Sequence, residues 1–400
     1  MKILIIVDNI FDNDIRVQRQ CIMLDKAGYE LVILCYDEGG KYKTYNKWTV
    51  IRYKISKFKK AIVMPLEIRL GTHTRLWSNF ISKQLIANQP NLVVAHDMYM
   101  AKPTKLAIVK SKLNIKFILD LHETYPHAVQ SYGWTQSTLR KLIAKPKKWL
   151  ELEESYLNYA DAIIFLSDSF RNRTVERYPF LNKENTMILP NVSDIDFLNA
   201  QNIDLSVIDT STEKCRIFYF GLISQARGVF DLINVVNEAI DLGANFELIL
   251  VGPVVKSDKL EFNDCLHEDL NKKFIKYIPW ININNLMSYL NIVDICVSPL
   301  WINPQHESGI ANKVFQYMFG GKPLVVSNCK PQAELVLKTN SGFVYKDLLE
   351  FRDILLKLEA DKHLRIELGQ NGKRAIEEKY NLNHFSVSYI KFINKIVSNG

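Results

Sequence analysis

One stretch in the second half of the sequence combines residue types that bind anions. The letters ESGIANK at 307–313 form a glycine-containing loop, and an apolar helical pattern follows until Gly320-Gly321. A loop that leads into a helix offers unpaired backbone N–H groups and the positive end of the helix dipole. Lys313 adds a full positive charge at the same place. The pattern therefore indicates an anion site, although an ordinary loop with a solvated lysine would have the same composition.

A second basic turn lies at 219–228, where the letters are YFGLISQARG. It reads as the end of a strand, a flexible turn that carries Arg227, and the start of a helix. The planar guanidinium of arginine can bind a phosphate through two parallel hydrogen bonds. A single loop arginine is more often just solvated, but two basic turns in one domain favour a ligand with two phosphates.

Short apolar runs alternate with helical patterns throughout the chain, and this order predicts a parallel sheet covered by helices. In the first half the predicted strands are 3–7, 31–35, 92–95, 117–119 and 162–166, and the longest predicted helices are 15–27, 74–88 and 139–159. In the second half the predicted strands are 217–220, 246–251, 295–298 and 324–326, and the predicted helices include 230–242, 286–290 and 313–319. A polar segment without periodicity separates the two series, which is typical of a linker.

We therefore expect an α/β protein with two doubly wound, Rossmann-like domains that face each other across a cleft. The predicted parts are 1–190, a linker at 191–213, 214–380, and a C-terminal helix at 381–400 that packs back on the first domain. Ligands of such sheets bind beyond the carboxyl ends of the strands. Two facing domains of this kind would suit the joining of two substrates.

The composition excludes several other classes of protein. With 48% hydrophobic residues, and only 16 Gly and 13 Pro among 400 residues, the chain is neither disordered nor collagen-like. Its six cysteines form no Cys-x-x-Cys pair, and no signal peptide or membrane-spanning run is evident, so we expect a reduced, cytoplasmic location. No strand is followed by Gly-x-Gly-x-x-Gly, which disfavours a dinucleotide-dependent dehydrogenase.

Positive charge is concentrated in the first half. Residues 1–190 carry 29 Lys and Arg against 18 Asp and Glu, whereas the remainder carries 22 against 25. Two basic clusters, at 52–60 and 140–150, interleave lysines and arginines with aromatic and aliphatic residues. Such segments favour the anionic inner leaflet of a membrane as a partner, and a peripheral location there. A solvated basic face, or capture of an acidic acceptor, would give the same pattern.

Motifs along nearly the whole chain make it resemble the retaining glycosyltransferases of family 4, which have the two-Rossmann-domain GT-B fold. The matching segments are NDIRVQR at 13–19, DLHE at 120–123, LPNV at 189–192, the Gly221–Gly228 turn, ILVG at 249–252, and NKVFQYM with GKP at 312–323. The resemblance implies transfer of a sugar, with retention, from a UDP- or GDP-linked donor to a glycan or lipid-linked acceptor. It also implies bacterial surface-polysaccharide synthesis, such as capsule or O-antigen, with no nucleic-acid partner. No divalent metal is usual in this family, and the sequence has no Asp-x-Asp motif.

The resemblance assigns roles residue by residue. The catalytic candidates are His122 and Glu307. The residues expected to bind the donor diphosphate are Arg227, Gly309, Asn312 and Lys313. The residues expected to bind the donor ribose and base are Gln316, Gly252, Pro279 and Trp280. The residues expected on the acceptor side are Asp14, Arg16, Asp97 and Glu123.

Two departures from the family pattern bear on these roles. Gln316 occupies the position of the glutamate that normally binds the ribose, and an amide binds hydroxyls without charge assistance. Glu307 lies one residue out of register with the family's other glutamate. A nucleotide-sugar epimerase and a non-catalytic glycosyltransferase-like partner subunit remain the alternatives.

Overall fold

The computed structural model describes the chain except for residues 131, 133–134, 136–137, 209–212, 269–270 and 399–400. The chain divides into two compact units, and each is described by itself. The first unit contains Met1–Pro190 and Phe385–Gly400, and the second contains Asn191–His384. The segment 191–213, expected as a linker, is part of the second unit and contains helix α10 (Ile195–Asn199).

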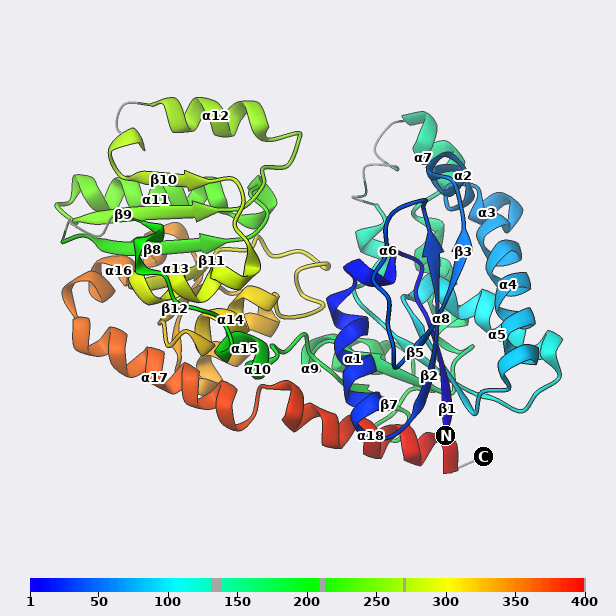
Figure 1. The fold of residues 1–400 in the computed structure, drawn as a ribbon. Helices are drawn as coiled ribbons and strands as arrows, with labels where there is room; N and C mark the ends of the chain where they lie inside the picture. The colour runs from blue at the N-terminus through cyan, green and yellow to red at the C-terminus, as the bar shows by residue number, and fades with distance from the viewer. Residues whose placement is uncertain (131, 133–134, 136–137, 209–212, 269–270, 399–400) are drawn as a thin grey trace. The chain divides into compact units, whose positions relative to one another are not determined.

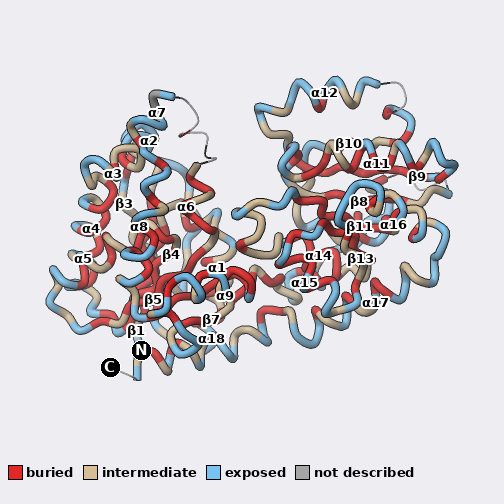
Figure 2. The backbone as a smooth tube through the Cα atoms, turned by 180° about the vertical axis from the view of Figure 1, so that it is seen from behind, coloured by how far each residue is buried: buried red, intermediate tan, exposed pale blue. Residues whose placement is uncertain are grey.

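The first unit is built on a seven-stranded parallel sheet with the order β3-β2-β1-β4-β5-β6-β7 (Figure 1). Its strands are β1 Lys2–Ile6, β2 Glu30–Asp37, β3 Thr49–Lys54, β4 Leu92–His96, β5 Lys116–Asp120, β6 Ala162–Phe165 and β7 Thr186–Ile188. The inner strands are buried on both faces, as their continuous apolar runs predict (Figure 2).

Helices complete the first unit: α1 Ile15–Lys26, α2 Lys57–Val63, α3 Glu67–Leu70, α4 Thr72–Asn88, α5 Ala101–Ser111, α6 Tyr125–Ala128, α7 Thr138–Ala144, α8 Lys148–Leu157, α9 Asp168–Arg177 and the end of α18 Leu382–Ser398. The single helix expected over 139–159 was wrong. It is broken between α7 and α8, because Pro146 lacks an N–H and disfavours helical geometry at Lys145, whose φ is +44°. On α18, Tyr389 Oη donates to Gln20 Oε1 of α1 at 2.9 Å.

The second unit has a six-stranded parallel sheet with the order β10-β9-β8-β11-β12-β13. Its strands are β8 Cys215–Phe220, β9 Phe246–Val251, β10 Ile275–Ile278, β11 Ile295–Ser298, β12 Leu324–Ser327 and β13 Gly342–Tyr345. Its remaining helices are α11 Val229–Asp241, α12 Lys259–His267, α13 Leu286–Ile292, α14 Asn312–Phe319, α15 Lys330–Thr339, α16 Leu348–Ala360 and α17 Lys362–Glu378. The α/β class with two Rossmann-like sheets is confirmed.

Each sheet reverses its strand order at one point, between β1 and β4 in the first unit and between β8 and β11 in the second. The loops that leave two neighbouring strands there diverge to opposite faces and create a crevice, which is where ligands of open α/β sheets bind. The candidate site residues are therefore sought beyond the carboxyl ends of these four strands.

Among the described residues, no helix is both long enough and apolar enough to cross a bilayer.

Candidate active site

A buried carboxylate organises the candidate site of the first unit. Asp120 ends β5 and is fully buried, and both its oxygens accept hydrogen bonds from Arg16, at 2.7 Å from Nη2 and 3.0 Å from Nε. Gln20 Nε2 donates to the same carboxylate at 2.5 Å. Burial opposes the negative charge, but Arg16 and the two neighbouring histidines outweigh it and hold the pKa of Asp120 well below its usual range. Asp120 therefore carries a fixed negative charge.

His122 lies against this carboxylate. Its Nε2 is 2.9 Å from His96 Nδ1 and 3.4 Å from Asp120 Oδ2, and its Nδ1 is 3.9 Å from Asp97 Oδ1. Burial disfavours the imidazolium, but the Asp97 and Asp120 carboxylates outweigh it and raise the pKa of His122 to about 9. The ring is thus a cation at neutral pH that can donate hydrogen bonds. His96, which ends β4, fixes its orientation.

Asp97 occupies the reversal point of the sheet in a strained conformation. It follows β4 directly, with φ +74° and ψ +144°, a region that residues other than glycine rarely adopt. Strained residues held by their surroundings cluster at functional sites. Burial raises the pKa of this carboxyl, against the opposing effect of His122.

The remaining first-unit candidates have clear contacts. Arg16 also donates from Nη1 to the Leu189 carbonyl at 2.9 Å. Asp14 caps α1 by accepting from Val17 N at 2.9 Å, a structural role that neither requires nor excludes acceptor contact. Glu123 accepts a hydrogen bond from Tyr132 Oη. The structure thus brings Arg16, Asp97 and His122 together around Asp120.

His96, Asp120 and His122 have ligand-type atoms within 4.8 Å of one another, the spacing of a metal site. The Asp120 oxygens, however, already accept from Arg16 and Gln20, and the guanidinium would repel a cation. The arrangement fits a hydrogen-bonded network better than a metal centre.

In the second unit the central feature is Lys313 at the start of α14. The residue is 6% exposed, and its ammonium has no hydrogen-bond partner among the described residues. It lies 3.7 Å from the centre of the Tyr219 ring at the end of β8. Burial, and then the charge of Arg227, lower the pKa of Lys313 well below its usual range. A buried, unpaired cation costs free energy that an anionic ligand would recover.

The two loops at the reversal point of the second sheet contact each other closely. Trp301 N donates to the Ala226 carbonyl at 3.0 Å. A Cβ on Gly228, which has φ +68°, would lie 1.8 Å from the Pro299 carbonyl oxygen, so only glycine fits there. This contact fixes the loop that precedes α11, on which Arg227 lies. The Arg227 guanidinium has no ion-pair partner among the described residues.

The loop before α14 offers further donors. The backbone N–H groups of Gly309, Asn312 and Lys313 have no hydrogen-bond partner in the described part of the chain. The Gln316 side chain, in a residue only 8% exposed, likewise makes no hydrogen bond to a described residue. Glu307 is half-buried on the same loop, and its backbone N donates to the Asn303 carbonyl at 3.0 Å. The roles of these residues remain predictions.

The predicted base-binding residues follow the neighbouring strands. Gly252 follows β9 directly and has φ +139°, and a Cβ there would lie 2.0 Å from the Gly221 carbonyl oxygen, which is a structural reason for this glycine. Pro279 and Trp280 follow β10, and the Trp280 indole is 72% exposed. An exposed indole beyond a strand end is available to stack on a flat ligand.

Sequence reasoning missed His96, which ends β4, and Asp8, which lies two residues after the end of β1. Asp8 accepts from His73 Nε2 at 3.1 Å and from Trp77 Nε1 at 3.2 Å. The signal was available, because an ionisable residue at the end of a wholly apolar strand lies at the ligand-binding edge of the sheet. Tyr219 belongs to the basic turn at 219–228, but its ring contact with Lys313 links positions 94 residues apart and has no signal in the sequence.

Comparison with known proteins agrees with this architecture. Residues 15–197 match the family model "Glycosyltransferase Family 4", and residues 214–361 match "Glycosyl transferases group 1". The chain belongs to the GT-B glycosyltransferases. Its two family domains together account for both units, with the His122 network in one and Lys313 in the other.

Solved structures of the same fold cover this GT-B chain end to end. The sucrose-phosphate synthase of Thermosynechococcus elongatus superimposes with a TM-score of 0.72 at 14% identity, over all of both chains. Anabaena Alr3699/HepE in complex with UDP has the same TM-score and identity, over 98% of this chain and all of that one.

Among curated proteins, the capsular polysaccharide biosynthesis glycosyltransferase CapM of Staphylococcus aureus is 23% identical over 168 residues. That alignment covers 41% of this chain and 42% of CapM. The chain spans about half the length of the curated relatives it matches.

Proposed function

We propose that this protein transfers a sugar, with retention of anomeric configuration, from a nucleoside-diphosphate sugar to a hydroxyl of a glycan or lipid-linked glycan. The observation that carries the proposal is the buried ammonium of Lys313, which has no hydrogen-bond partner among the described residues. A diphosphate is the ligand class that such a cation, together with Arg227 and unpaired N–H groups, would bind.

The same groups would assist the reaction. When the glycosidic bond to the donor breaks, negative charge grows on the departing diphosphate. Cations and N–H donors already in place lower the barrier, because they need no rearrangement as the charge develops. The depressed pKa of Lys313 would rise beside the diphosphate, so its ammonium would be fully charged at that moment.

The first unit would supply the sugar-binding face. His122 is held as an imidazolium between Asp97 and Asp120, so it can donate a hydrogen bond to a sugar oxygen without moving. The strained backbone of Asp97 keeps that carboxyl at the reversal point of the sheet. Fixed donors and acceptors of this kind select one orientation of a polyhydroxylated ring.

The comparisons support finer choices. A neighbour of the same fold is described in complex with UDP, which favours a uridine donor over a guanosine one. CapM is named for capsular polysaccharide biosynthesis, which supports a role in bacterial surface-polysaccharide synthesis. A cytoplasmic location is part of this proposal.

The deciding experiment presents the purified protein with UDP- and GDP-sugars and follows binding by calorimetry and donor turnover by NMR. We expect tight binding of one nucleotide, slow donor hydrolysis without acceptor, and a product with the donor's anomeric configuration. Arg227→Ala should weaken nucleoside-diphosphate binding at least tenfold, or about 1.4 kcal/mol. Donor epimerisation would support an epimerase instead, and binding with no turnover would indicate a non-catalytic subunit.

We further propose that the first unit binds an anionic membrane surface through α2. Phe58 is 77% exposed, and Lys57 and Lys59 are exposed beside it. Other members of the basic clusters at 52–60 and 140–150 are not available to a membrane surface: Arg52 pairs with Asp12 at 2.9 Å, and Trp149 is buried. The side chain of Arg140 lies outside the described residues. Co-sedimentation should require anionic vesicles and weaken in Lys57→Glu/Lys59→Glu, and recovery in the supernatant with both vesicle types would end this proposal.

A further inference from the structure

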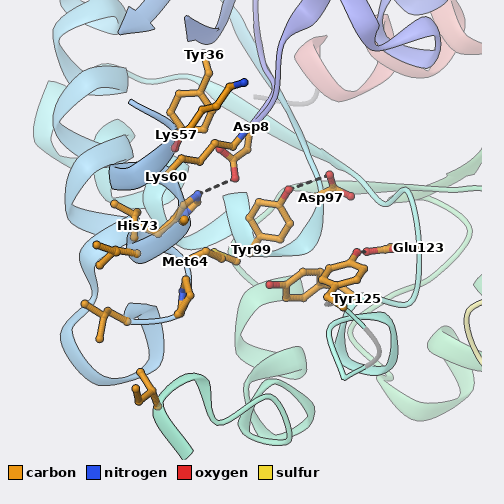
Figure 3. A pocket seen from close by; sticks show the side chains of 17 residues that line it. Asp8, Tyr36, Lys57, Lys60, Met64, His73, Asp97, Tyr99, Glu123 and Tyr125 are labelled. Carbon is orange, nitrogen blue, oxygen red and sulfur yellow. Dashed lines mark hydrogen bonds and ion pairs between the residues drawn. The ribbon is translucent and has the colours of Figure 1, made fainter. Parts of the chain in front are cut away.

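A pocket of about 700 Å³ opens in the first unit beside the reversal point of its sheet (Figure 3). It contains Asp8 after β1 and Asp97 after β4, so it lies where ligands of such sheets bind. Asp97 belongs both to this pocket and to the surroundings of His122, with 3.9 Å between Asp97 Oδ1 and His122 Nδ1. A molecule in the pocket would therefore reach the His122 network.

One part of the pocket is rich in hydrogen-bonding groups. Three carboxylates line it, from Asp8, Asp97 and Glu123, and the rings of Tyr99 and Tyr125 pack with their centres 4.7 Å apart. Carboxylates accept hydrogen bonds from hydroxyl groups, and aromatic rings pack against the C–H faces of sugars. Lys57 and Lys60 also line the pocket, so its charged side chains are of both signs. This part favours a hydroxyl-rich ring, as in a sugar.

The Tyr125 hydroxyl is an independent sign of a ligand. Tyr125 is 1% exposed, yet its Oη has no hydrogen-bond partner among the described residues. Burial raises the pKa of this phenol well above its usual range, so it remains a neutral donor and acceptor. A buried hydroxyl without a hydrogen-bond partner is unfavourable, and a ligand hydroxyl would satisfy it.

The other part of the pocket is apolar. It is lined by the end of α2 and the turn before α3, with Ile62, Val63, Met64, Pro65 and Leu66, and by Ile143 of α7. Ile62 is 39% exposed, so this wall is accessible to a ligand. A wall of this kind is a poor partner for a second sugar but a good one for an alkyl chain.

We propose that this pocket binds the acceptor, and that the acceptor is a sugar attached to an apolar group rather than a free glycan. The sugar occupies the part with Tyr99, Tyr125 and the carboxylates, and the apolar group lies along residues 62–66. This inference rests on the proposed transferase function, because only a transferase has an acceptor. The binding itself can be tested without a donor.

The test measures binding of matched methyl and octyl glycosides of glucose, galactose, mannose and N-acetylglucosamine to the full chain without nucleotide. Saturation-transfer NMR and calorimetry are used below the micelle-forming concentration. For at least one sugar, the octyl glycoside should bind at least tenfold more tightly than the methyl glycoside. Absence of binding by every octyl glycoside, or equal binding of the methyl and octyl partners, overturns the proposal.

Two variants test the apolar part and the sugar-binding part of the pocket separately. Ile62→Glu should remove the octyl advantage and leave methyl-glycoside binding unchanged. The control Val109→Glu makes the same kind of change at a more exposed position on α5 outside the pocket, and it should alter neither. Tyr125→Phe should weaken both glycosides at least threefold without lowering thermal stability, because its hydroxyl has no partner in the described chain to lose. Unchanged binding in Tyr125→Phe overturns the sugar placement. Because donor binding is not measured here, these results are independent of the outcome for UDP and GDP.

Discussion

The two units have the same kind of sheet and carry charged residues at the same topological position, yet those residues are in opposite electrostatic states. In the first unit Asp120 is neutralised by Arg16 and flanked by two histidines, so the buried charges satisfy one another. In the second unit Lys313 and Arg227 are both basic, and neither has an ion-pair partner among the described residues.

This difference distinguishes charged groups that stabilise the fold from charged groups that contribute to ligand binding. Removing one member of a satisfied buried pair leaves an uncompensated charge and destabilises the fold. Removing a lone buried cation relieves a desolvation cost and damages only ligand binding. Stability and binding should therefore respond in opposite ways in the two units.

The largest expected effect is on stability in the first unit. Asp120→Asn should lower the free energy of unfolding by about 3–5 kcal/mol, because Arg16 then remains buried without its counter-charge. Lys313→Met in the second unit should raise the melting temperature instead. Denaturant unfolding of both variants checks the comparison, and equal loss of stability in the two would contradict it.

A second effect is the pH dependence of stability from His122. Its pKa in the folded protein, about 9, is above the ordinary value of 6.5, so its contribution is complete below about pH 6.5 and is lost as pH rises through about 9. Wild type should exceed His122→Gln in free energy of unfolding by about 2–3 kcal/mol at pH 6 and by much less at pH 9.5. A difference that does not change with pH would show that the ring is neutral.

The pH response of Lys313 should appear in ligand binding. Its pKa is depressed in the free protein and rises beside a diphosphate, so binding takes up protons at pH values between the two pKa values. UDP affinity should fall as pH rises through that window, and calorimetry in buffers of different ionisation enthalpy should detect uptake of up to one proton. Lys313→Met should weaken binding at least tenfold, about 1.4 kcal/mol, and abolish the uptake. Proton uptake that persists in this variant would assign it to another group.

The fold was largely predictable from the sequence, and its missed strands share one property. The strands β3, β7, β10 and β13 were not predicted, and they are the four edges of the two sheets. Edge strands are exposed along one side, so β3 and β10 mix Arg or Lys with apolar residues and lack the continuous run that marks an inner strand. The inner strands are buried on both faces, and their sequences carry that information directly.

The candidate site was predictable only in part. Lys313 and Arg227 were identified by a loop before a helix and by family motifs, which are local signals. The lack of a partner for Lys313 and for Tyr125 Oη is a property of packing between distant segments, which no spacing reveals. His96 was missed because its partner His122 is 26 residues away and meets it only through the pairing of β4 with β5.

The smallest expected effect concerns Gln316, where an amide replaces the family's usual carboxylate. Its side chain makes no hydrogen bond to a described residue, so it is free to bind the hydroxyls of a donor ribose. Gln316→Ala should weaken UDP binding by about 0.5–1.5 kcal/mol, the net value of a neutral hydrogen bond. Gln316→Glu should be tolerated and should tighten binding slightly, because hydrogen bonds to a charged acceptor are stronger, provided that the diphosphate is not close enough to repel it. The matched probe is 2′-deoxy-UDP: wild type should discriminate against it, and Gln316→Ala should not. Equal affinity of wild type for the two nucleotides would place Gln316 away from the 2′-hydroxyl and leave Lys313 and Arg227 as the groups that hold the donor in the second unit.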